Sequence, residues 1–241
     1  MTTLLNDLRH ALRQLRKSPG FAALAIGTLA VGIGASTAIY SIVDGVLLRS
    51  LPFRNPQRIV SVFESFPSLG FNETTFSAPD FEYVVHHNRS FTAMAAYRDQ
   101  EYELSGSGNP VRLDGARVSA TLSSILGVAP ELGRFFTQDE DRSGAPVVVL
   151  SDTFWRRHFA ANPGALGQKI LLDRQPYTVI GVMPHSFAFP SRGERWNNIP
   201  GEFYTPMHFT PEQLQNIGDE YNYSAIARLK PAFPSHRRAR K

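Results

Sequence analysis

Three consecutive carboxylates are the densest group of potentially reactive side chains in this 241-residue chain. Asp139, Glu140 and Asp141 carry oxygens that could bind calcium, or that could transfer a proton in acid–base catalysis. They lie in a polar segment between Phe136 and Gly144, where carboxylates are normally hydrated. We therefore predict a solvated loop at this position rather than a calcium or acid–base site.

Two further groups combine histidine with other polar side chains. Glu82, His86 and His87 lie one turn apart on a predicted helix, a spacing that zinc sites use, but no further ligand has a suitable local spacing. Trp155 precedes basic residues 156–158, which together could hold an anion. A core tryptophan whose basic neighbours face water explains the same pattern, and we predict surface histidines and a buried Trp155.

The sequence motifs of the common catalytic and nucleotide sites are absent from the 241 residues. We find no GxxxxGK(S/T) phosphate loop, no GxGxxG after a strand, no HExxH and no GxSxG. The chain also has no cysteine, which excludes disulfides and thiolate metal sites. We predict no catalytic, cofactor-binding or metal-binding residue and no bound cofactor, so that ATP acts only through another subunit.

The positive charge of the chain belongs to its two ends. The formal net charge is +4, but residues 1–20 carry +3 and residues 231–241 carry +4. Residues 21–230 hold 17 basic and 20 acidic side chains. A domain that binds nucleic acid carries its positive charge on the folded body, so we predict no nucleic-acid partner.

Residues 21–43 form a run of 23 positions without one charged side chain, and after Asp44 the apolar character continues to Leu48. At about 1.5 Å per residue such a helix reaches roughly 35 Å, enough to cross a hydrocarbon core of about 30 Å. The run exceeds the apolar core of roughly 7–15 residues in a signal peptide, and it lacks the polar stripe of a buried core helix. We predict a transmembrane helix over residues 21–48. Small residues that favour packing against other helices gather on one side: Gly27, Gly32, Gly34, Ala30, Ala35 and Ala38.

The segment before this run has an amphipathic pattern. Six apolar residues fall within about 120° on a helical projection, and basic and polar residues occupy the rest. We predict that residues 1–20 form an interfacial helix beside anionic lipid, with an ordinary amphipathic helix packed on protein as the alternative. Four Lys/Arg precede the run and three follow it closely, a difference too small to set the orientation. The apolar side consists of Leu4, Leu5, Leu8, Ala11, Leu12 and Leu15.

Residues 49–230 have the composition of a globular domain with mixed secondary structure. The mixture, with a hairpin that turns near residues 173–176, favours an α+β fold with a mixed or antiparallel sheet over a parallel doubly wound sheet. Predicted strands cover residues 59–63, 111–118, 147–150, 170–172 and 177–182. Predicted helices begin at Ser77, with Asp80 completing a capping box, at Ser151, and at Thr210 with an end at Gly218; a short one covers residues 120–126 before Gly127.

Several segments, taken in their order and spacing, resemble MacB/FtsX-like ABC transporter permeases, especially the long acidobacterial-type permeases. The resemblance covers about residues 5–230 and continues from the membrane segment into a MacB-like core domain. Its parts are LRHALRQLRKSPGFAALAIGTLAVGIGASTAIYSIVDGVLLRSLPF at 8–53, RIV at 58–60, SAPDF at 77–81, GRFF at 133–136 followed by DED at 139–141, VVLS at 148–151 with Trp155 and Phe159, GQKI at 167–170, and YTVIGVMP at 177–184.

This resemblance implies a location and a set of partners. Residues 1–20 would lie at the cytoplasmic side of the bacterial inner membrane, residues 21–48 would span it once, and residues 49–230 would form the extracytoplasmic core domain. The partners implied are the lipid bilayer, a separate cytoplasmic ABC ATPase and further permease transmembrane helices in a dimeric assembly. The chain would then transmit the ATPase cycle to an extracytoplasmic domain for export or mechanotransmission, without being an enzyme.

One departure from this family concerns the end of the chain. Family members carry at least three further spans after the outer domain, whereas no apolar run after Leu48 approaches 18 residues. Residues 231–241 are basic, and we predict that they are disordered. We expect an N-terminal fragment of a permease; an intact frame that stops directly after Lys241, with no permease-like sequence downstream, would contradict this. The alternatives are a single-pass anchored extracytoplasmic binding or adaptor protein, and a membrane-anchored enzyme, which would need an active-site cluster.

Overall fold

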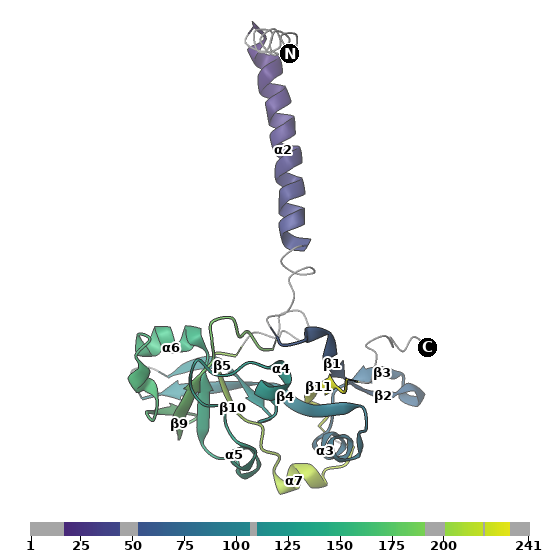
Figure 1. Ribbon diagram of the computed structural model, residues 1–241, viewed down its shortest axis with the longest axis vertical. Helices are drawn as coiled ribbons and strands as arrows, with labels where there is room; N and C mark the ends of the chain where they lie inside the picture. The colour runs from purple at the N-terminus through teal and green to yellow at the C-terminus, as the bar shows by residue number, and fades with distance from the viewer. Residues whose placement is uncertain (1–16, 44–52, 107–109, 191–200, 219, 232–241) are drawn as a thin grey trace. The chain divides into compact units, whose positions relative to one another are not determined.

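The computed structural model describes residues 17–43, 53–106, 110–190, 201–218 and 220–231 (Figure 1). The chain divides into two compact units, Met1–Leu51 and Pro52–Lys241, which we describe separately. Most of the predicted interfacial helix at residues 1–20, and nearly all of the predicted tail at residues 231–241, lie outside the described residues.

The first unit contains α2 (Pro19–Val43), a helix of 25 residues without a charged side chain. Its segment Pro19–Tyr40 is long and apolar enough to cross a membrane, and none of it is buried inside the protein. Large side chains such as Leu24 and Val31 are 69% and 72% exposed. The Thr37 hydroxyl donates to the Ile33 carbonyl one turn earlier at 2.8 Å, which satisfies the hydroxyl within the helix. The predicted apolar helix is therefore present over residues 21–43, and residues 44–48 of the predicted span lie outside the described residues.

The second unit is built on one large mixed sheet, so the predicted α+β class is confirmed. Within the described residues the sheet has nine strands in the order β1-β11-β4-β5-β10-β7-β9-β6, with β8 paired to β4 and β9. Pairs β5–β10 and β7–β9 are parallel, and the others are antiparallel. The strands are β1 (Ile59–Val62), β4 (Phe91–Ser105), β5 (Val111–Val118), β6 (Leu132–Gly133), β7 (Val147–Leu150), β8 (Lys169–Leu172), β9 (Gln175–Val182), β10 (Phe203–Pro206) and β11 (Ser224–Leu229).

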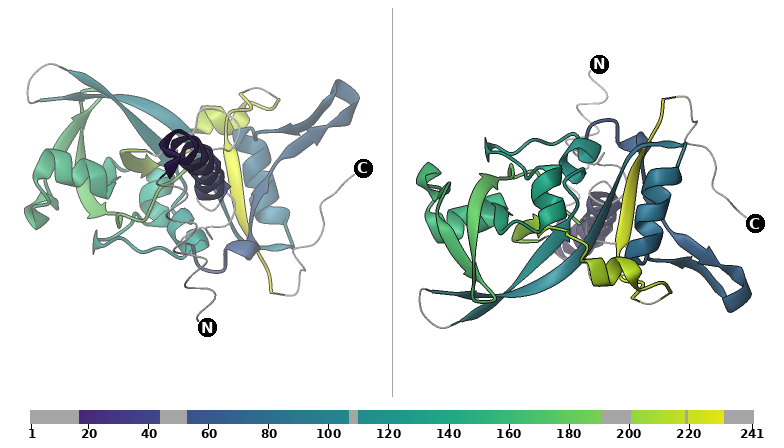
Figure 2. Two further views of the ribbon diagram at one scale, coloured as in Figure 1. Left: turned by 90° about the horizontal axis from the view of Figure 1, so that it is seen from above. Right: turned by 90° about the horizontal axis from the view of Figure 1, so that it is seen from below.

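Strand β4 connects the two ends of this sheet, and the sequence prediction missed it. Its first half pairs with β11, its second half with β5, and its last residues with β8. Residues 93–96 include three alanines and residues 98–101 are polar or charged, so neither β-branched content nor apolar alternation marks the segment as a strand. Long-range pairing on both edges therefore creates β4. Figure 2 shows this long strand crossing the second unit.

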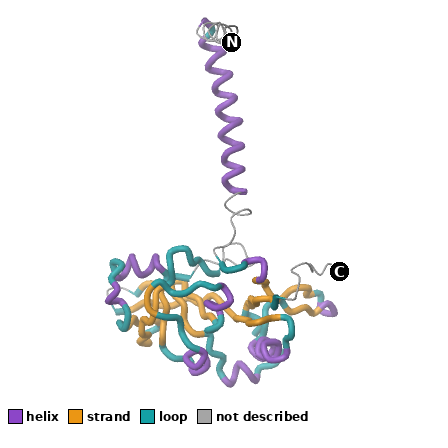
Figure 3. The backbone as a smooth tube through the Cα atoms, viewed as in Figure 1, coloured by secondary structure: helices purple, strands orange, loops and turns teal. Residues whose placement is uncertain are grey.

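Helices and loops flank the strands on both faces (Figure 3). One face packs Tyr97, Val118 and Tyr204 against α4 (Leu122–Leu126). The opposite face carries two apolar clusters at its two ends. Helix α3 (Ala78–His87) covers Met94 and Ala96 of β4 with Phe81, and α6 (Asp152–Phe159) covers Val148 and Phe203 with Phe154. Two short helices, α5 (Gln138–Ser143) and α7 (Pro211–Gln215), and a separate hairpin of β2 (Glu64–Phe66) and β3 (Phe71–Thr74) complete the unit, with 3-10 turns at Pro56–Arg58, Pro67–Leu69 and Pro163–Ala165.

Several of the predicted helix starts and turns are confirmed. Ser151 Oγ accepts the Phe154 N–H at 3.1 Å, and α4 ends at Gly127 with a left-handed φ of 69°. The predicted β8–β9 hairpin turns at Asp173 and Arg174, both with positive φ, as a type I′ hairpin turn requires.

Three sequence predictions need correction. The capping box predicted at Ser77 is only half formed. Ser77 Oγ accepts the Asp80 N–H, but the Asp80 carboxylate accepts from the Ser77 hydroxyl at 2.6 Å instead of from the Ser77 backbone N–H. Helix α7 ends at Gln215 rather than at Gly218. The predicted solvated loop at residues 139–141 is wrong, because these residues lie within helix α5.

Candidate functional cleft

A polar cleft of about 380 Å³ lies on the sheet face that carries the two apolar clusters; we call it the central cleft. Its lining comes from β4, β5, β9 and β10 and from the segment that leads into α7. Strand residues of one parity share a face, so alternate positions on these strands reach the same surface. The polar residues that line the cleft are Gln100, Tyr102, Arg117, Asp173, Gln175, Tyr177, Thr205, His208 and Thr210.

The floor of the central cleft is a buried pair of hydroxyl groups. The hydroxyls of Tyr102 and Thr205 lie 2.7 Å apart, and the two residues are 6% and 2% exposed. Burial raises the pKa of Tyr102 to about 12, and the hydrogen bond to Thr205 opposes that rise. The floor therefore stays neutral at physiological pH and offers hydrogen-bonding groups rather than charge.

Arg117 is the cationic side chain of the central cleft. Thr205 lies beside Arg117 in the parallel pair of β10 and β5. The guanidinium donates to the backbone carbonyls of Pro206 at 3.4 Å and His208 at 2.8 Å, and also to that of Met207. Within the described part of the chain, no carboxylate forms an ion pair with Arg117. The acceptors that the described residues offer Arg117 are backbone carbonyls, and these hydrogen bonds also fix the segment that follows β10.

His208 forms the wall between the central cleft and a second pocket of about 280 Å³ beside α7. Its backbone N–H donates to Asp141 Oδ1 at 3.2 Å, and its Nδ1 lies 2.8 Å from the Arg142 carbonyl. Asp141 Oδ2 also accepts the Ala120 N–H at 2.7 Å. Burial raises the pKa of Asp141, although these N–H donors oppose the rise. Asp141 thus ties α5 to the residues that precede α4 and α7.

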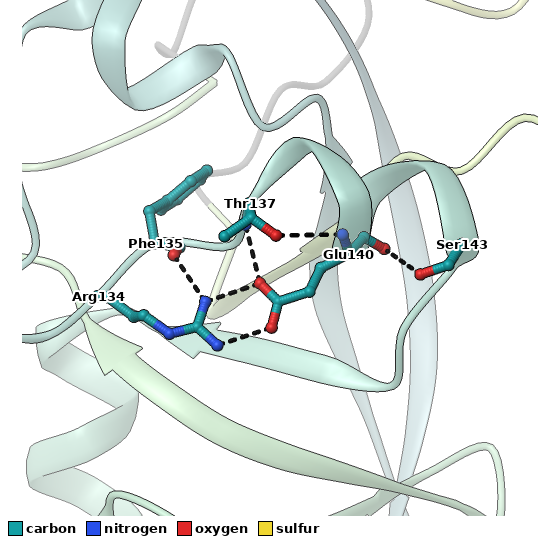
Figure 4. A network of polar contacts seen from close by, with 5 residues as sticks. All are labelled: Arg134, Phe135, Thr137, Glu140 and Ser143. Atoms are coloured by element: carbon teal, nitrogen blue, oxygen red, sulfur yellow. Dashed lines mark hydrogen bonds and ion pairs between the residues drawn. The ribbon is translucent and has the colours of Figure 1, made fainter.

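Glu140 closes a second polar network at the start of α5, drawn in Figure 4. Arg134 Nη1 and Nη2 donate to its two carboxylate oxygens at 2.7 and 2.6 Å. The Thr137 N–H donates to the same carboxylate at 2.8 Å, while Thr137 Oγ1 accepts the Glu140 N–H, which makes a full capping box. These donors, the Arg134 guanidinium first, lower the pKa of Glu140 to about 2.

The run at residues 139–141 therefore serves helix α5 rather than one shared site. Glu140 and Asp141 direct their oxygens to different donors, and Asp139 is 96% exposed beside Arg142. The capping box was readable in the sequence as Thr137 followed three positions later by Glu140, the pattern that marks a helix start. The burial of Asp141 had no local signal, because its donors are 21 and 67 positions away.

The predicted surface histidines on α3 do not converge on one point. Glu82 and His86 lie 3.3 Å apart across one helical turn at the surface. His87 instead places its Nδ1 2.8 Å from the Tyr83 carbonyl and stacks on the Tyr83 ring. Over the described ranges, no three His, Cys, Asp or Glu side chains lie close enough together to hold a metal ion.

Trp155 is a core residue, as predicted, and its basic neighbours lie at the surface. It is 8% exposed and donates its indole N–H to the Asn162 carbonyl at 2.9 Å. Arg156 Nε donates to Asp152 at 2.8 Å, and Arg157 pairs with Glu202. Asp152, 2% exposed in its side chain, also contacts His185 Nδ1 at 2.8 Å, and Arg156 foremost holds its pKa below the usual value. Arg156 and Arg157 are thus engaged with carboxylates rather than open to an anion, and His158 stacks on the Phe154 ring.

Comparison with known proteins points to one family. The family model of the MacB-like periplasmic core domain matches residues 22–233. The chain is 49% identical over 79 residues to the macrolide export ATP-binding/permease protein MacB of Nitrosomonas europaea, which covers 33% of this chain and 11% of that protein. It is 29% identical over 213 residues to the "Probable syringafactin export ATP-binding/permease protein SyfD" of Pseudomonas syringae, covering 85% of this chain and 31% of that protein.

The fold is also similar to a solved structure. The crystal structure of the periplasmic region of MacB from Actinobacillus actinomycetemcomitans aligns with a TM-score of 0.53 at 15% identity, over 74% of this chain and 77% of that one. This similarity concerns the fold alone. The chain spans no more than about a third of the two curated relatives described above.

Proposed function

The chain belongs to the MacB-like periplasmic core domain family, and from this premise we propose that it is a permease component of an ABC-type export or mechanotransmission complex. One observation carries the proposal: a single family match over residues 22–233 joins the apolar helix α2 to the α+β domain. Such a component passes movement from a cytoplasmic ATPase through its membrane helix to the outer domain. The domain itself has a connecting role in this proposal and no catalytic one.

Helix α2 supports an assembly with further transmembrane helices. Its large apolar side chains, Leu24 and Val31 among them, are exposed, and no described residue comes within 4 Å of a Cβ built at Gly27, Gly32 or Gly34. In a bilayer, close packing at small residues is a main source of helix association. We propose that this side of α2 packs against other permease helices in a dimeric assembly.

The proposed location is the bacterial inner membrane, with residues 1–20 at the cytoplasmic face and residues 49–230 outside. The description of the family as periplasmic supports this orientation. Reporter fusions test it: alkaline phosphatase after Ala232 should be active, and green fluorescent protein before Thr3 should fluoresce. The reverse pattern would contradict the orientation.

The proposed energy source is a separate cytoplasmic ABC ATPase. The two relatives are named as ATP-binding/permease proteins, and these 241 residues contain no phosphate-binding loop. Affinity purification of the tagged full chain from mild-detergent extracts of its native membranes tests the proposal. An ABC ATPase should be recovered in fixed stoichiometry, and a stable monomer without a partner would favour the anchored binding or adaptor protein instead.

A paired variant sharpens that experiment. Gly32→Leu fills the small-residue side of α2 and should reduce recovery of the partner subunits. Leu29→Ile keeps the side-chain volume on the opposite side of the helix and should leave recovery unchanged. Equal recovery with both variants would contradict packing through the small-residue side.

A further inference from the structure

We propose that the central cleft binds an oxyanion group, a carboxylate or a phosphate, carried by a small polar ligand. The groups assigned to this contact are the Arg117 guanidinium, the Tyr177 hydroxyl and the Gln175 amide, which all line the cleft. This binding site is additional to the permease role, and it does not depend on which ATPase or helices the chain meets.

The first support is the charge balance of the cleft. Arg117 is half-buried, and the part of the chain that the structure describes provides it with no carboxylate partner. Asp173 is the carboxylate that lines the cleft, and its Oδ1 already accepts the Glu103 N–H at 2.8 Å. A guanidinium in a partly desolvated position gains more from an anion than one in open water does.

The second support is the unused hydrogen-bonding capacity around Arg117. Its Nε and Nη2 donate to backbone carbonyls, whereas Nη1 has no acceptor among the described residues. The Tyr177 hydroxyl and the Gln175 amide likewise make no side-chain hydrogen bond within the described ranges. They stand two residues apart on β9 and therefore on the same side of the strand.

The third support is the size and polarity of the site. About 380 Å³ lies within the range of small-molecule sites, and the Tyr102–Thr205 floor adds neutral hydrogen-bonding groups below the charge. Arg117 with two neutral polar partners suits an oxyanion on a hydroxylated or amide-bearing molecule. An apolar ligand would bury these polar groups without partners and is disfavoured.

The experiment uses the full chain in phosphatidylcholine nanodiscs, with its tyrosines replaced by 3-fluorotyrosine. Fluorine NMR follows Tyr177, assigned by its loss in Tyr177→Phe, during separate titrations with sodium phosphate, sodium citrate and sodium chloride at equal ionic strength. Phosphate or citrate should shift the Tyr177 signal saturably, and the stronger of the two identifies the preferred oxyanion. Tyr83, which stacks on His87 away from the cleft, is the internal control and should not shift.

Two variants separate binding from folding. Arg117→Lys keeps the charge but loses the planar guanidinium, and it should lower the affinity for the oxyanion at least about tenfold. Arg117 also holds the backbone of residues 206–208, so its replacement could disturb the fold. Gln175→Ala provides an independent test at an exposed position and should lower the affinity for the oxyanion about threefold. A Tyr177 signal that does not saturate, that follows chloride equally, or that is unchanged by both variants would overturn the site. None of these results alters the co-purification outcome on which the permease proposal depends.

Discussion

Two glutamates of the same domain have opposite titration behaviour. Glu140, at the start of α5, receives three hydrogen bonds, and its pKa falls to about 2. Glu64, in the hairpin of β2 and β3, keeps a buried Oε2 atom for which the described residues offer no partner. Burial first, and the nearby Asp80 second, raise the pKa of Glu64 to about 7. Within one fold, the supply of donors decides which protonation state of the carboxyl group is favoured.

The two regions also differ in how firmly they are attached to the sheet. The α5 region is tied to Ala120 and His208 through Asp141. The hairpin extends beyond β1, at the edge of the second unit (Figures 1 and 2), and its Leu69 and Phe71 are 69% and 59% exposed. The anchored region therefore contains the carboxylate with three hydrogen bonds, and the projecting hairpin contains the carboxyl group with one unpartnered oxygen among the described residues.

The largest effect is expected from Asp141→Ala. The substitution leaves the N–H groups of Ala120 and His208 without their acceptor, which should lower the free energy of unfolding by about 2–4 kcal/mol. Urea unfolding of the full chain in detergent micelles, followed by tryptophan fluorescence, measures it. Asp139→Ala, at a 96% exposed side chain, should cost at most about 0.5 kcal/mol, and equal losses would contradict the anchoring role.

Glu140→Ala should have the next largest effect, because it removes the capping box and the paired bonds from Arg134. We expect a loss of about 1–2 kcal/mol at pH 7 by the same measurement. The matched control is Glu101→Ala, which breaks an exposed Arg112–Glu101 pair without a cap and should cost under about 1 kcal/mol.

The pH dependence of this loss has a defined sign. Since the folded pKa of Glu140 lies below its unfolded value of 4.5, its contribution is complete above pH 4.5 and disappears as the pH falls toward 2. Wild type and Glu140→Ala should therefore converge in stability across that window. A constant difference between them down to pH 2 would contradict the assigned pKa.

Glu64→Gln should act in the opposite direction and more weakly. The raised pKa means that the folded state holds a proton that the unfolded state releases, so stability declines as the pH rises from about 4.5 to about 7. The variant, neutral throughout, should lose this decline and be more stable than wild type at pH 8. Unfolding curves of wild type and variant at pH 5 and pH 8 measure this difference. The same pH dependence in both proteins would show that Glu64 is not its cause.

The smallest effect is expected from Asp80→Asn. Removing the neighbouring charge should lower the pKa of Glu64 but leave it above 4.5, because burial is the larger cause. Carbon-detected NMR titration of the glutamate carboxyl groups follows the change directly. A Glu64 pKa that returns fully to 4.5 would reverse the order of the two causes.

The elements that the sequence predicted are those that neighbouring residues determine. The uncharged run predicted α2, Ser151 predicted the start of α6, and the turn residues at 173–176 predicted the β8–β9 hairpin. Strand β11 was missed because its SAIARL sequence has little β-branched content, and β10 because Pro206 ends a run of only four residues. These strands depend on partners far along the chain, which no short window contains.

The central cleft was missed for the same reason. Arg117, Gln175 and Thr205 come from three strands, and each side chain on its own looks like an ordinary surface residue. Their proximity follows from the β5–β10 and β7–β9 parallel pairs, which join segments separated by loops and helices. Only the register of the sheet shows that these positions meet.

The pairing of β1 with β11 delays completion of the sheet in the newly made chain until the last strand has been synthesised. Ile59 lies opposite Arg228, so the first strand of the sheet waits for the last one, and β4 waits for the same partner. At about 5–20 residues per second, synthesis of the intervening segment takes roughly 10–30 seconds. From their own synthesis until β11 is made, Met94 and Ala96, which end in the apolar core, have one strand edge uncovered. The protein is therefore most exposed to misfolding during its synthesis, and the rate of translation sets how long this stage lasts.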